Sequence, residues 1–429
     1  MKTAHSRRDF LHASLAGISS LTLSASSYAR IPGANQKLGI AIIGVGGQGG
    51  FSLGNLAAIE NIVALCDVDS DRVKKERSTH SQAFFSQDFR EIVTRRDVDA
   101  VAVCTPDHTH APIAIAAMKE GKHVYCEKPL CHSIHEVQAL MNEARKRKLV
   151  TQMGTQIHAG DNYRRVVEIV QSGKLGTIQE VHTWVGGSYA AEDFPADKPA
   201  IPPGLNYDLW LGPAEEQAYH PSFVPFYWRK YWKFGTGCFG DMACHHMDLP
   251  FWALGLSMPL QVTAEGSPVH RTGCPTWVIA RYQFARPCGG SPIPLTWYDG
   301  GKRPPQFDKE GMPKWGAGNL FVGTEGMLLA DYGKYLLLPQ DKFANLKLEQ
   351  TIPATKGHHR EWCEAIKGNG QPLCQFDYSG PLSMAVLLGT VSYRTGKTLE
   401  WDQSASWVKN SQPEVDKLLR KTYRQGWSL

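Results

Sequence analysis

Two side chains that can exchange a proton, Asp241 and His245, lie four residues apart. In a helix this spacing puts both on one face. A carboxylate there can bind a sugar hydroxyl, and an imidazole can take up its proton near neutral pH. Asp248 is placed to orient the ring. Oxidation of a secondary alcohol also needs a donor for the developing alkoxide, and we expect Lys128, just beyond a strand end, to face the cofactor cleft, with a solvated surface lysine as the alternative.

A metal site made of His245, His246 and Asp248 is the rival interpretation of the same segment. Adjacent histidines on a helix point about 100° apart, so the two rings cannot both reach one ion without distortion. The ten cysteines contain no Cys-x-x-Cys pair. We therefore predict no metal, and a buried structural histidine remains the alternative for either ring.

A glycine-rich turn after the apolar run 38–43 fits a dinucleotide, because it reads Gly44-Val45-Gly46-Gly47-Gln48-Gly49. Its three spaced glycines permit the turn, the approach of a pyrophosphate and the packing of a helix on a strand. The diphosphate would lie at that helix N-terminus. Asp67 ends the next apolar run, where a carboxylate accepts from a free ribose hydroxyl and repels a 2′-phosphate. NAD is therefore favoured over NADP, although Arg72 and Lys74 weaken this preference.

Short apolar strands alternate with helical periods from residue 37 to about residue 156. We predict strands at 38–43, 62–66, 100–104, 123–126 and 150–153, and helices at about 111–120 and 134–147. This order predicts an α/β fold with an N-terminal Rossmann doubly wound parallel sheet. Ligands bind beyond the carboxyl ends of such strands, which points to loops 44–49, 105–110 and 127–130.

The pattern changes after residue 156 to a helix at about 162–171 and a series of strand-like runs. The runs are 178–185, 260–263, 277–284, 295–298, 320–322, 326–330 and 335–339. They predict a C-terminal α+β domain with a mostly antiparallel open sheet, which favours a homo-oligomer. Late helices at about 358–367 and 381–393 pack on that sheet or on the first domain. The predicted division is 1–29, 30–156 and 157–429.

Three further segments, taken with the glycine turn, resemble the Gfo/Idh/MocA oxidoreductase family. They are Thr105-Pro106-Asp107-His108-Thr109-His110, Glu127-Lys128-Pro129 and the segment 241–248. The resemblance covers essentially the whole chain after residue 29, including 210–213 and 357–362. It implies that Lys128 contacts both cofactor and substrate hydroxyl, and that Asp241 and His245 move the proton. It also implies that loop 105–110 lies along the nucleotide, with a structural role as the alternative for its histidines.

The candidate site residues follow from these motifs. For the cofactor they are Gly44, Gly46, Gln48, Gly49, Asp67, Thr105, Pro106, His108, His110, Glu127, Lys128 and Gln156. For the substrate they are His158, Trp232, Asp241 and His245. Loop packing is an equal alternative for Gln156 and His158. The aromatic run 226–234, which contains Trp232, can stack on sugar rings or fill the domain interface.

The N-terminus resembles a twin-arginine export signal, because Arg7 and Arg8 precede a charge-free, mostly apolar stretch at 12–25. Small residues at 27–29 predict cleavage after Ala29. An ordinary basic N-terminus and a general secretory signal are the alternatives. We expect export through the twin-arginine machinery to the periplasm. No other segment reaches the roughly 18 apolar residues that span a bilayer, so we expect no stable membrane insertion.

The formal charge of +5 comes without basic runs, which argues against nucleic acid as a partner. The ten cysteines are scattered, and we interpret those that end strands as small buried hydrophobes. A disulfide among the later ones stays open for an exported protein.

Together these features predict an exported nicotinamide-dependent oxidoreductase that acts on a secondary hydroxyl of a sugar or polyol. Because no NAD pool is expected outside the cytoplasm, its NAD would be tightly bound. The alternative within the family is a redox-neutral NAD-dependent glycosidase that works through a transient keto-sugar. A non-catalytic sensor is a third interpretation, against which Lys128, Asp241 and His245 argue.

Overall fold

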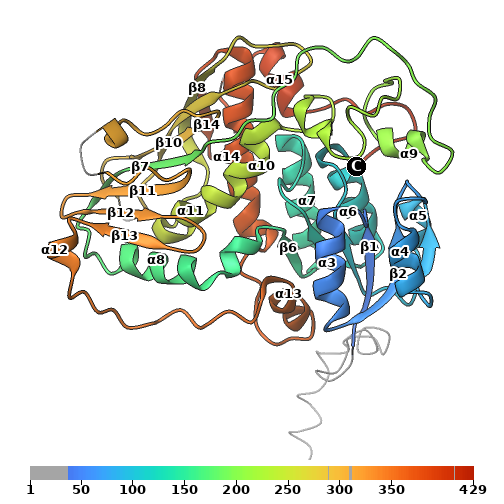
Figure 1. The fold of residues 1–429 in the computed structure, drawn as a ribbon, viewed down its shortest axis with the longest axis horizontal. Coiled ribbons are helices and arrows are strands. Elements are labelled where there is room, and N and C mark those ends of the chain that lie inside the picture. The colour runs from blue at the N-terminus through green and yellow to red at the C-terminus, as the bar shows by residue number, and fades with distance from the viewer. Residues whose placement is uncertain (1–36, 288, 309–311, 410) are drawn as a thin grey trace, which may run out of the picture.

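The computed structural model describes residues 37–287, 289–308, 312–409 and 411–429. The predicted export signal, with Arg7 and Arg8, lies outside these residues. The described chain forms two sheets, each with its own helices, that lie beside one another (Figure 1). No helix within these ranges is long and apolar enough to cross a membrane.

The first sheet is parallel throughout and has the strand order β3-β2-β1-β4-β5-β6. Its strands are β1 (Gly39–Ile43), β2 (Asn61–Cys66), β3 (Phe84–Ser86), β4 (Ala100–Val103), β5 (His123–Cys126) and β6 (Thr151–Met153). Its helices are α3 (Gln48–Ala57), α4 (Lys74–Thr79), α5 (Phe89–Val93), α6 (His110–Lys119) and α7 (Ile134–Arg147). The order reverses between β1 and β4, so the predicted doubly wound Rossmann sheet is confirmed.

Local capping explains why the predicted helix at 134–147 has those bounds. The Ser133 side chain accepts a hydrogen bond from the Glu136 amide at 3.4 Å, which caps the start of α7. Lys148 then adopts a left-handed conformation with φ of 53°, which ends the helix. Between these ends, apolar residues such as Val137 and Leu140 are fully buried.

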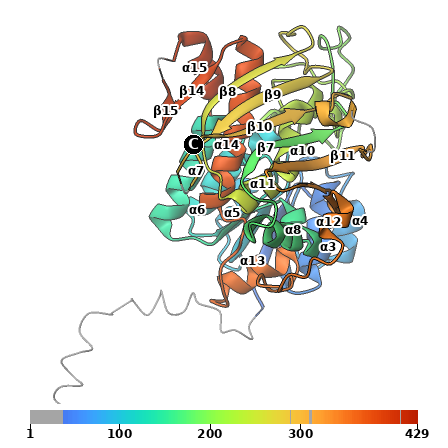
Figure 2. The same ribbon diagram turned by 90° about the vertical axis from the view of Figure 1, so that its left-hand side faces the viewer.

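The second sheet is mixed and mostly antiparallel, with the order β13-β12-β11-β7-β10-β9-β8-β14-β15. Only β7 and β10 pair in parallel among its described strands. The strands are β7 (Ile178–Val185), β8 (Pro259–Gly266), β9 (Val278–Phe284), β10 (Ile293–Tyr298), β11 (Ala317–Gly323), β12 (Met327–Ala330), β13 (Tyr335–Leu338), β14 (Leu399–Asp402) and β15 (Trp407–Val408). Figure 2 shows β7 to β11 side by side. The predicted α/β plus α+β fold is confirmed; the short strands β3, β14 and β15 were not predicted.

The helices of the second half lie against both sheets. They are α8 (Asp161–Gln171), α9 (Tyr207–Leu211), α10 (Gly237–His246), α11 (Asp248–Leu254), α12 (Gln340–Phe343), α13 (His358–Ile366), α14 (Phe376–Thr395) and α15 (Pro413–Leu419). Helix α13 places Trp362 and Cys363 in the core of the first sheet. Helix α14 packs on α7 and on β8, and so joins the two halves.

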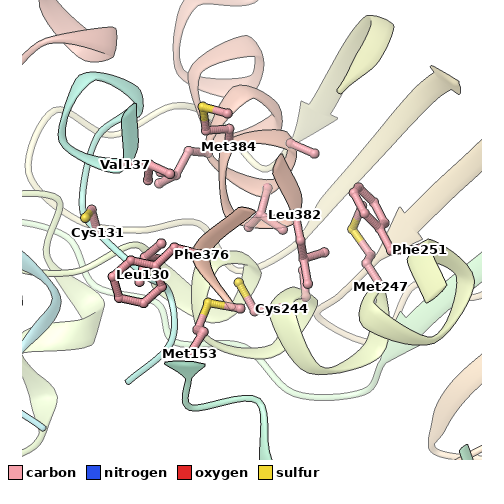
Figure 3. Packing of buried hydrophobic residues seen from close by; sticks show 14 of the residues in the cluster. Leu130, Cys131, Val137, Met153, Cys244, Met247, Phe251, Phe376, Leu382 and Met384 are labelled. Atoms are coloured by element: carbon pink, nitrogen blue, oxygen red, sulfur yellow. The ribbon is translucent and has the colours of Figure 1, made fainter. Parts of the chain in front are cut away.

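The core at this junction is continuous. Figure 3 shows Phe376 and Leu382 of α14 facing Leu130 and Met153 from the first sheet and Cys244 from α10. All five side chains are fully or almost fully buried. This apolar contact fixes α10 relative to the carboxyl ends of the parallel strands. The nine described cysteines are unpaired, and eight of them are buried.

Candidate active site

A cavity lies where the two halves meet, at the carboxyl ends of the parallel strands. Its wall on the first sheet comes from the loops at 44–48, 67–72, 104–109 and 127–128, among them the three loops predicted from the sequence. Its opposite wall includes Leu205, Trp210, Pro225, Phe226, Trp228, Arg229, His245 and Trp427. A cavity thus lies at the edge of the sheet where the sequence predicts a ligand site.

The glycine turn leaves room that a side chain would fill. A Cβ on Gly49 would lie 1.7 Å from the Gly44 carbonyl oxygen, and one on Gly46 would meet the Arg72 side chain at 2.4 Å. Gly44 has φ of +83°, which favours glycine. No side chain caps the N-terminus of α3. The Gly49 and Gly50 amides donate to the carbonyl oxygens of Gly46 and Gly47 at 3.2 Å and 3.1 Å, so the positive end of the helix and the Gln48 amide face an anion at this turn. These residues fit the pyrophosphate of a dinucleotide.

Asp67 braces the glycine turn. Its Oδ2 accepts from the Val45 amide at 2.8 Å and from the Gly46 amide at 3.4 Å, and its Oδ1 accepts from the Asp69 amide at 3.0 Å. Burial raises the pKa of Asp67, and these amide bonds oppose the increase. The carboxylate lines the cavity, so it can hold the loop and still face a ribose.

Asp241 holds two cations at the other end of the cavity. The Lys128 Nζ donates to its carboxylate and, at 3.1 Å, to its backbone carbonyl oxygen. The Arg229 Nε lies 3.4 Å from Asp241 Oδ1. Burial alone would raise the pKa of Asp241, but Lys128 and Arg229 outweigh it and hold that pKa well below its usual range. Asp241 is therefore a fixed negative charge rather than a base near neutral pH.

His245 lies on the same helix, α10, and lines the cavity, so the predicted helical spacing of Asp241 and His245 is confirmed. Burial and the charge of Lys128 hold the pKa of His245 well below its usual range. Its Nδ1 is buried and has no hydrogen-bond partner among the described residues. The ring is thus neutral near neutral pH.

Two buried acids border Lys128. Glu127 Oε1 accepts from Tyr125 and, at 2.9 Å, from Gln156, whereas its buried Oε2 has no partner among the described residues. Asp107 accepts from Thr236 at 2.8 Å. Burial raises the pKa of Glu127 and of Asp107 to about 7 in each case. Both acids line the cavity, while Gln156 contacts it through Glu127.

His108 and His110 are buried structural links. The His108 ring nitrogens contact the carbonyl oxygens of Phe234 and Trp210, at 3.2 Å and 3.0 Å. Those of His110 contact the carbonyl oxygens of Pro129 and Thr105, at 3.0 Å and 2.8 Å. Neither ring is among the cavity-lining side chains. Their geometry matches the structural alternative for the loop, while Thr105 and Pro106 themselves line the cavity.

His158 is not among the residues that line the cavity. Its Nδ1 contacts Asp248 at 2.9 Å, and its ring stacks on Trp252 with 4.0 Å between centroids. Asp248 raises the pKa of His158 to about 10 against the effect of burial. Asp248 therefore orients His158 and not, as predicted, His245.

The histidines of the rival metal site do not converge. His246 Nε2 contacts the Tyr332 hydroxyl at 3.0 Å, and ligand atoms of His245, His246 and Asp248 form no group close enough for one ion among the described residues. A different group does cluster: ligand atoms of His158, Asp248 and Cys374 lie within 4.8 Å of one another. A hydrogen bond already joins His158 to Asp248, so we interpret this cluster as a polar network.

Trp232 lies in the core, where its Nε1 donates to the His270 carbonyl oxygen at 3.3 Å. It does not line the cavity, whereas Phe226 and Trp228 of the same aromatic run do. Arg229, Asp107 and Trp427 also line it and were not among the predicted site residues. Arg229 stands inside the run singled out by the sequence, but no local spacing marks Trp427.

Family models match both halves of the chain. The model described as oxidoreductase family, NAD-binding Rossmann fold, Gfo/Idh/MocA, matches residues 38–155. The model of the same family's C-terminal alpha/beta domain matches residues 164–293. The first match includes the glycine turn and Lys128, and the second includes Asp241 and His245.

Curated relatives are similar over part of their length. A glycosyl hydrolase family 109 protein of Solibacter usitatus is 38% identical over 40% of this chain and 44% of its own length. A myo-inositol 2-dehydrogenase of Thermotoga maritima is 33% identical over 53% of this chain and 58% of its own. The chain thus spans about half the length of such relatives.

Solved structures share the fold. The aldose-aldose oxidoreductase from Caulobacter crescentus has a TM-score of 0.55 at 18% identity, over 85% of this chain and 100% of the other. At this identity the likeness concerns the fold alone.

Proposed function

We propose that this chain, which belongs to the Gfo/Idh/MocA oxidoreductase family, is a NAD-dependent oxidoreductase that acts on a secondary hydroxyl of a sugar or polyol. One observation carries the proposal. A neutral His245 with an unpartnered Nδ1 shares a cavity with Lys128 and with a glycine turn built for a dinucleotide. The His245 ring, the Lys128 side chain and the glycine turn therefore border one space.

His245, Lys128 and Asp241 have different roles in the proposed alcohol oxidation. Bound NAD supplies the two-electron acceptor for the hydrogen on the carbinol carbon. His245 accepts the hydroxyl proton, because its ring is neutral. Lys128 donates to the substrate oxygen and stabilises its developing negative charge. Asp241 holds the Lys128 ammonium in place through its carboxylate and carbonyl oxygens. In the reverse direction His245 returns the proton.

The hydrogen bonds of the segment between β7 and α10 are an argument for a tightly bound cofactor. The Ser70 amide donates to the Gly204 carbonyl oxygen at 3.0 Å, and the Asn206 amide donates to that of Val68 at 2.8 Å. At its other end, the Phe234 carbonyl oxygen accepts from the His108 amide at 3.3 Å. The segment is thus tied to the loops after β2 and after β4, and it crosses the cavity between them.

Retention of the cofactor agrees with the proposed export. The twin-arginine pathway carries folded proteins, so an enzyme loaded in the cytoplasm would reach the periplasm with its NAD. Replacement of Arg7 and Arg8 by lysine should leave the protein in the cytoplasm. Unchanged export of that variant, or a mature N-terminus far from residue 30, would contradict this part of the proposal.

A redox-neutral glycosidase is the second candidate, favoured by the 38% identity to a glycosyl hydrolase family 109 protein. In that reaction oxidation of a ring hydroxyl acidifies the neighbouring C–H. Loss of that proton expels the aglycone by elimination, addition of water follows, and the hydride returns to the sugar. The oxidoreductase is preferred because His245 and Lys128, which Asp241 holds in place, suit proton transfer from a free secondary alcohol.

One experiment separates the two candidates. Purified enzyme with its bound NAD is mixed with single sugars while nicotinamide fluorescence is followed. An oxidoreductase should build a bound-NADH signal with one sugar and discharge it with a second carbonyl substrate. A glycosidase should release the aglycone from an aryl glycoside alone, with solvent deuterium in the product. Steady reduction of added NAD would instead show that the cofactor exchanges.

A further inference from the structure

Arg229 is a cation at the reacting end of the cavity for which the proposed reaction has no role. Its guanidinium lies over the Trp228 ring at 4.1 Å and over the Phe226 ring at 4.8 Å. All three residues line the cavity, and the Arg229 side chain is 20% exposed. The two rings hold the guanidinium in a fixed place beside the substrate space.

The hydrogen bonds of Arg229 leave part of its guanidinium group without an acceptor. Its Nε lies 3.4 Å from Asp241 Oδ1, and its Nη1 lies 3.5 Å from the Phe226 carbonyl oxygen, so both contacts are long. Its Nη2 has no acceptor among the described residues. Asp241 is already held by Lys128 at the same oxygen, so one carboxylate faces two cations.

The neighbouring acids do not add a permanent negative charge to that of Asp241. Asp107 and Glu127 both have a pKa raised to about 7 by burial, so each takes up a proton as the pH falls below neutral. Lys128 and Arg229 then face only Asp241. Below neutral pH this end of the cavity therefore carries two cations, Lys128 and Arg229, against the one carboxylate of Asp241, in a place of low exposure where an anion is favoured.

We propose that the substrate is an acid sugar whose carboxylate binds Arg229. The planar guanidinium presents parallel N–H groups that match a carboxylate, whereas a hydroxyl uses only one of them. The Phe226 ring beside it is 46% exposed and suits the C–H face of a sugar ring. The proposal rests on the proposed function and narrows its substrate class to hexuronates and aldonates.

The test compares sugars that differ only in the carboxylate. The pairs are glucuronate with glucose, galacturonate with galactose, and gluconate with glucitol, each added to NAD-loaded enzyme at pH 6. Binding is measured by calorimetry and turnover by bound-nicotinamide fluorescence. At least one acid should bind about 10- to 100-fold more tightly than its neutral partner, the range expected for a charge-assisted hydrogen bond.

Variants then assign the preference to Arg229. Arg229→Gln should abolish the preference for the acid over the neutral sugar. Arg229→Lys should keep part of that preference, because lysine retains the positive charge but lacks the paired N–H groups of the guanidinium. Lys230→Gln is the matched control: Lys230 lies over the Tyr227 ring at 4.6 Å and does not line the cavity. That variant should keep the full preference.

The outcomes are distinct. Equal binding of acids and neutral sugars, no binding of either, or a preference that survives in Arg229→Gln would overturn the acid-sugar proposal. Tight binding of an acid that never reduces the cofactor would support the proposal about Arg229 and contradict the proposed oxidoreductase. Reduction of the cofactor by neutral sugars as readily as by acids would support the proposed oxidoreductase and contradict the acid-sugar proposal.

Discussion

His158 and Asp248 form a fully buried ion pair, in which the ring Nδ1 lies 2.9 Å from one carboxylate oxygen and 3.0 Å from the other. The Tyr378 hydroxyl donates to the same carboxylate at 2.7 Å. The pair joins the turn after β6 to the start of α11. It therefore links the parallel sheet to α11, which directly follows α10, the helix that carries Asp241 and His245.

We expect this pair to make stability depend on pH in the alkaline range. The folded-state pKa of His158 is raised to about 10, above the value near 6.5 of an unfolded histidine. Its stabilisation is therefore complete below about pH 6.5 and is lost as the pH rises toward 10. His158→Gln should cost about 3–5 kcal/mol of unfolding free energy at pH 6. The difference from wild type should shrink as the pH rises.

Urea unfolding of both proteins between pH 6 and pH 10 measures this difference. His220→Gln is the control, because its ring contacts Asp197 at 3.3 Å in a pair whose carboxylate is 73% exposed. An exposed pair contributes little, so that variant should match wild type at each pH. A cost of His158→Gln that does not change with pH would show that packing on Trp252, rather than charge, explains it.

The pairing of His158 illustrates what the sequence could not predict. Gln156 and His158 follow the last parallel strand, so their position near the cavity could be predicted from strand order alone. The partner of His158 lies 90 residues further along the chain. Its contact depends on how α11 packs, which no local pattern encodes.

Local signals predicted most of the parallel sheet. Strands at 62–66 and 123–126 and the helix at 134–147 need only apolar periodicity and a capping serine, so their bounds agree with the structure to within a residue. The helix predicted at 381–393 instead begins at Phe376, ahead of Pro381, because Phe376 is buried in the core at the junction. Tertiary packing decides that boundary.

The cover of the cavity depends on long-range contacts. Trp427 lies two residues from the end of the sequence and still lines the cavity, because Arg424 donates to the Asp208 carbonyl oxygen at 2.7 Å and to that of Gly212. Arg229 was visible in the sequence only as part of an aromatic run. Its role follows from the position of Asp241, which α10 supplies.

Lys128→Ala and His245→Ala should each lower the rate of cofactor reduction by about 100- to 10,000-fold, the range for groups that move or stabilise a proton. Nucleotide binding should survive, because the glycine turn is untouched. Single-turnover fluorescence of bound nicotinamide measures the rate, and NAD content measures binding.

His246→Asn is the matched control for His245. His246 is adjacent on α10, but its ring contacts Tyr332 at 3.0 Å and does not line the cavity. It should keep a near-normal rate. A near-normal rate in either Lys128→Ala or His245→Ala would remove that residue from the proton path.

Asp67→Asn should weaken NAD binding by about tenfold, because the carboxylate both braces the Val45 amide at 2.8 Å and faces the cavity. It should also narrow the preference for NAD over NADP, since the repulsion of a 2′-phosphate is lost. Titration of stripped enzyme with each cofactor measures both effects.

Asp71→Asn removes a carboxylate from the same loop without touching the turn, because Asp71 pairs with the exposed Lys74 at 2.8 Å. It should bind both cofactors as wild type does. An unchanged cofactor preference in Asp67→Asn would contradict the role given to Asp67.

Trp427→Ala should speed the loss of bound NAD about tenfold or more. The Trp427 ring lies 6.0 Å from the Phe89 ring and 4.8 Å from the Arg90 guanidinium. Together with the segment 202–236, Trp427 closes the cavity toward the end that holds Asp67. Removal of the indole opens that side while the glycine turn stays intact. Because the anchor at Arg424 is unchanged, the fold should be retained.

Release is measured by repeated desalting of NAD-loaded enzyme and by the absorbance of the nucleotide that remains. Trp277→Ala is the control, because Trp277 lies under Lys302 at 4.3 Å and does not line the cavity. It should retain NAD as wild type does. Equal retention in Trp427→Ala would mean that the C-terminal residues do not hold the cofactor, and rapid loss from the wild type would exclude a trapped cofactor altogether.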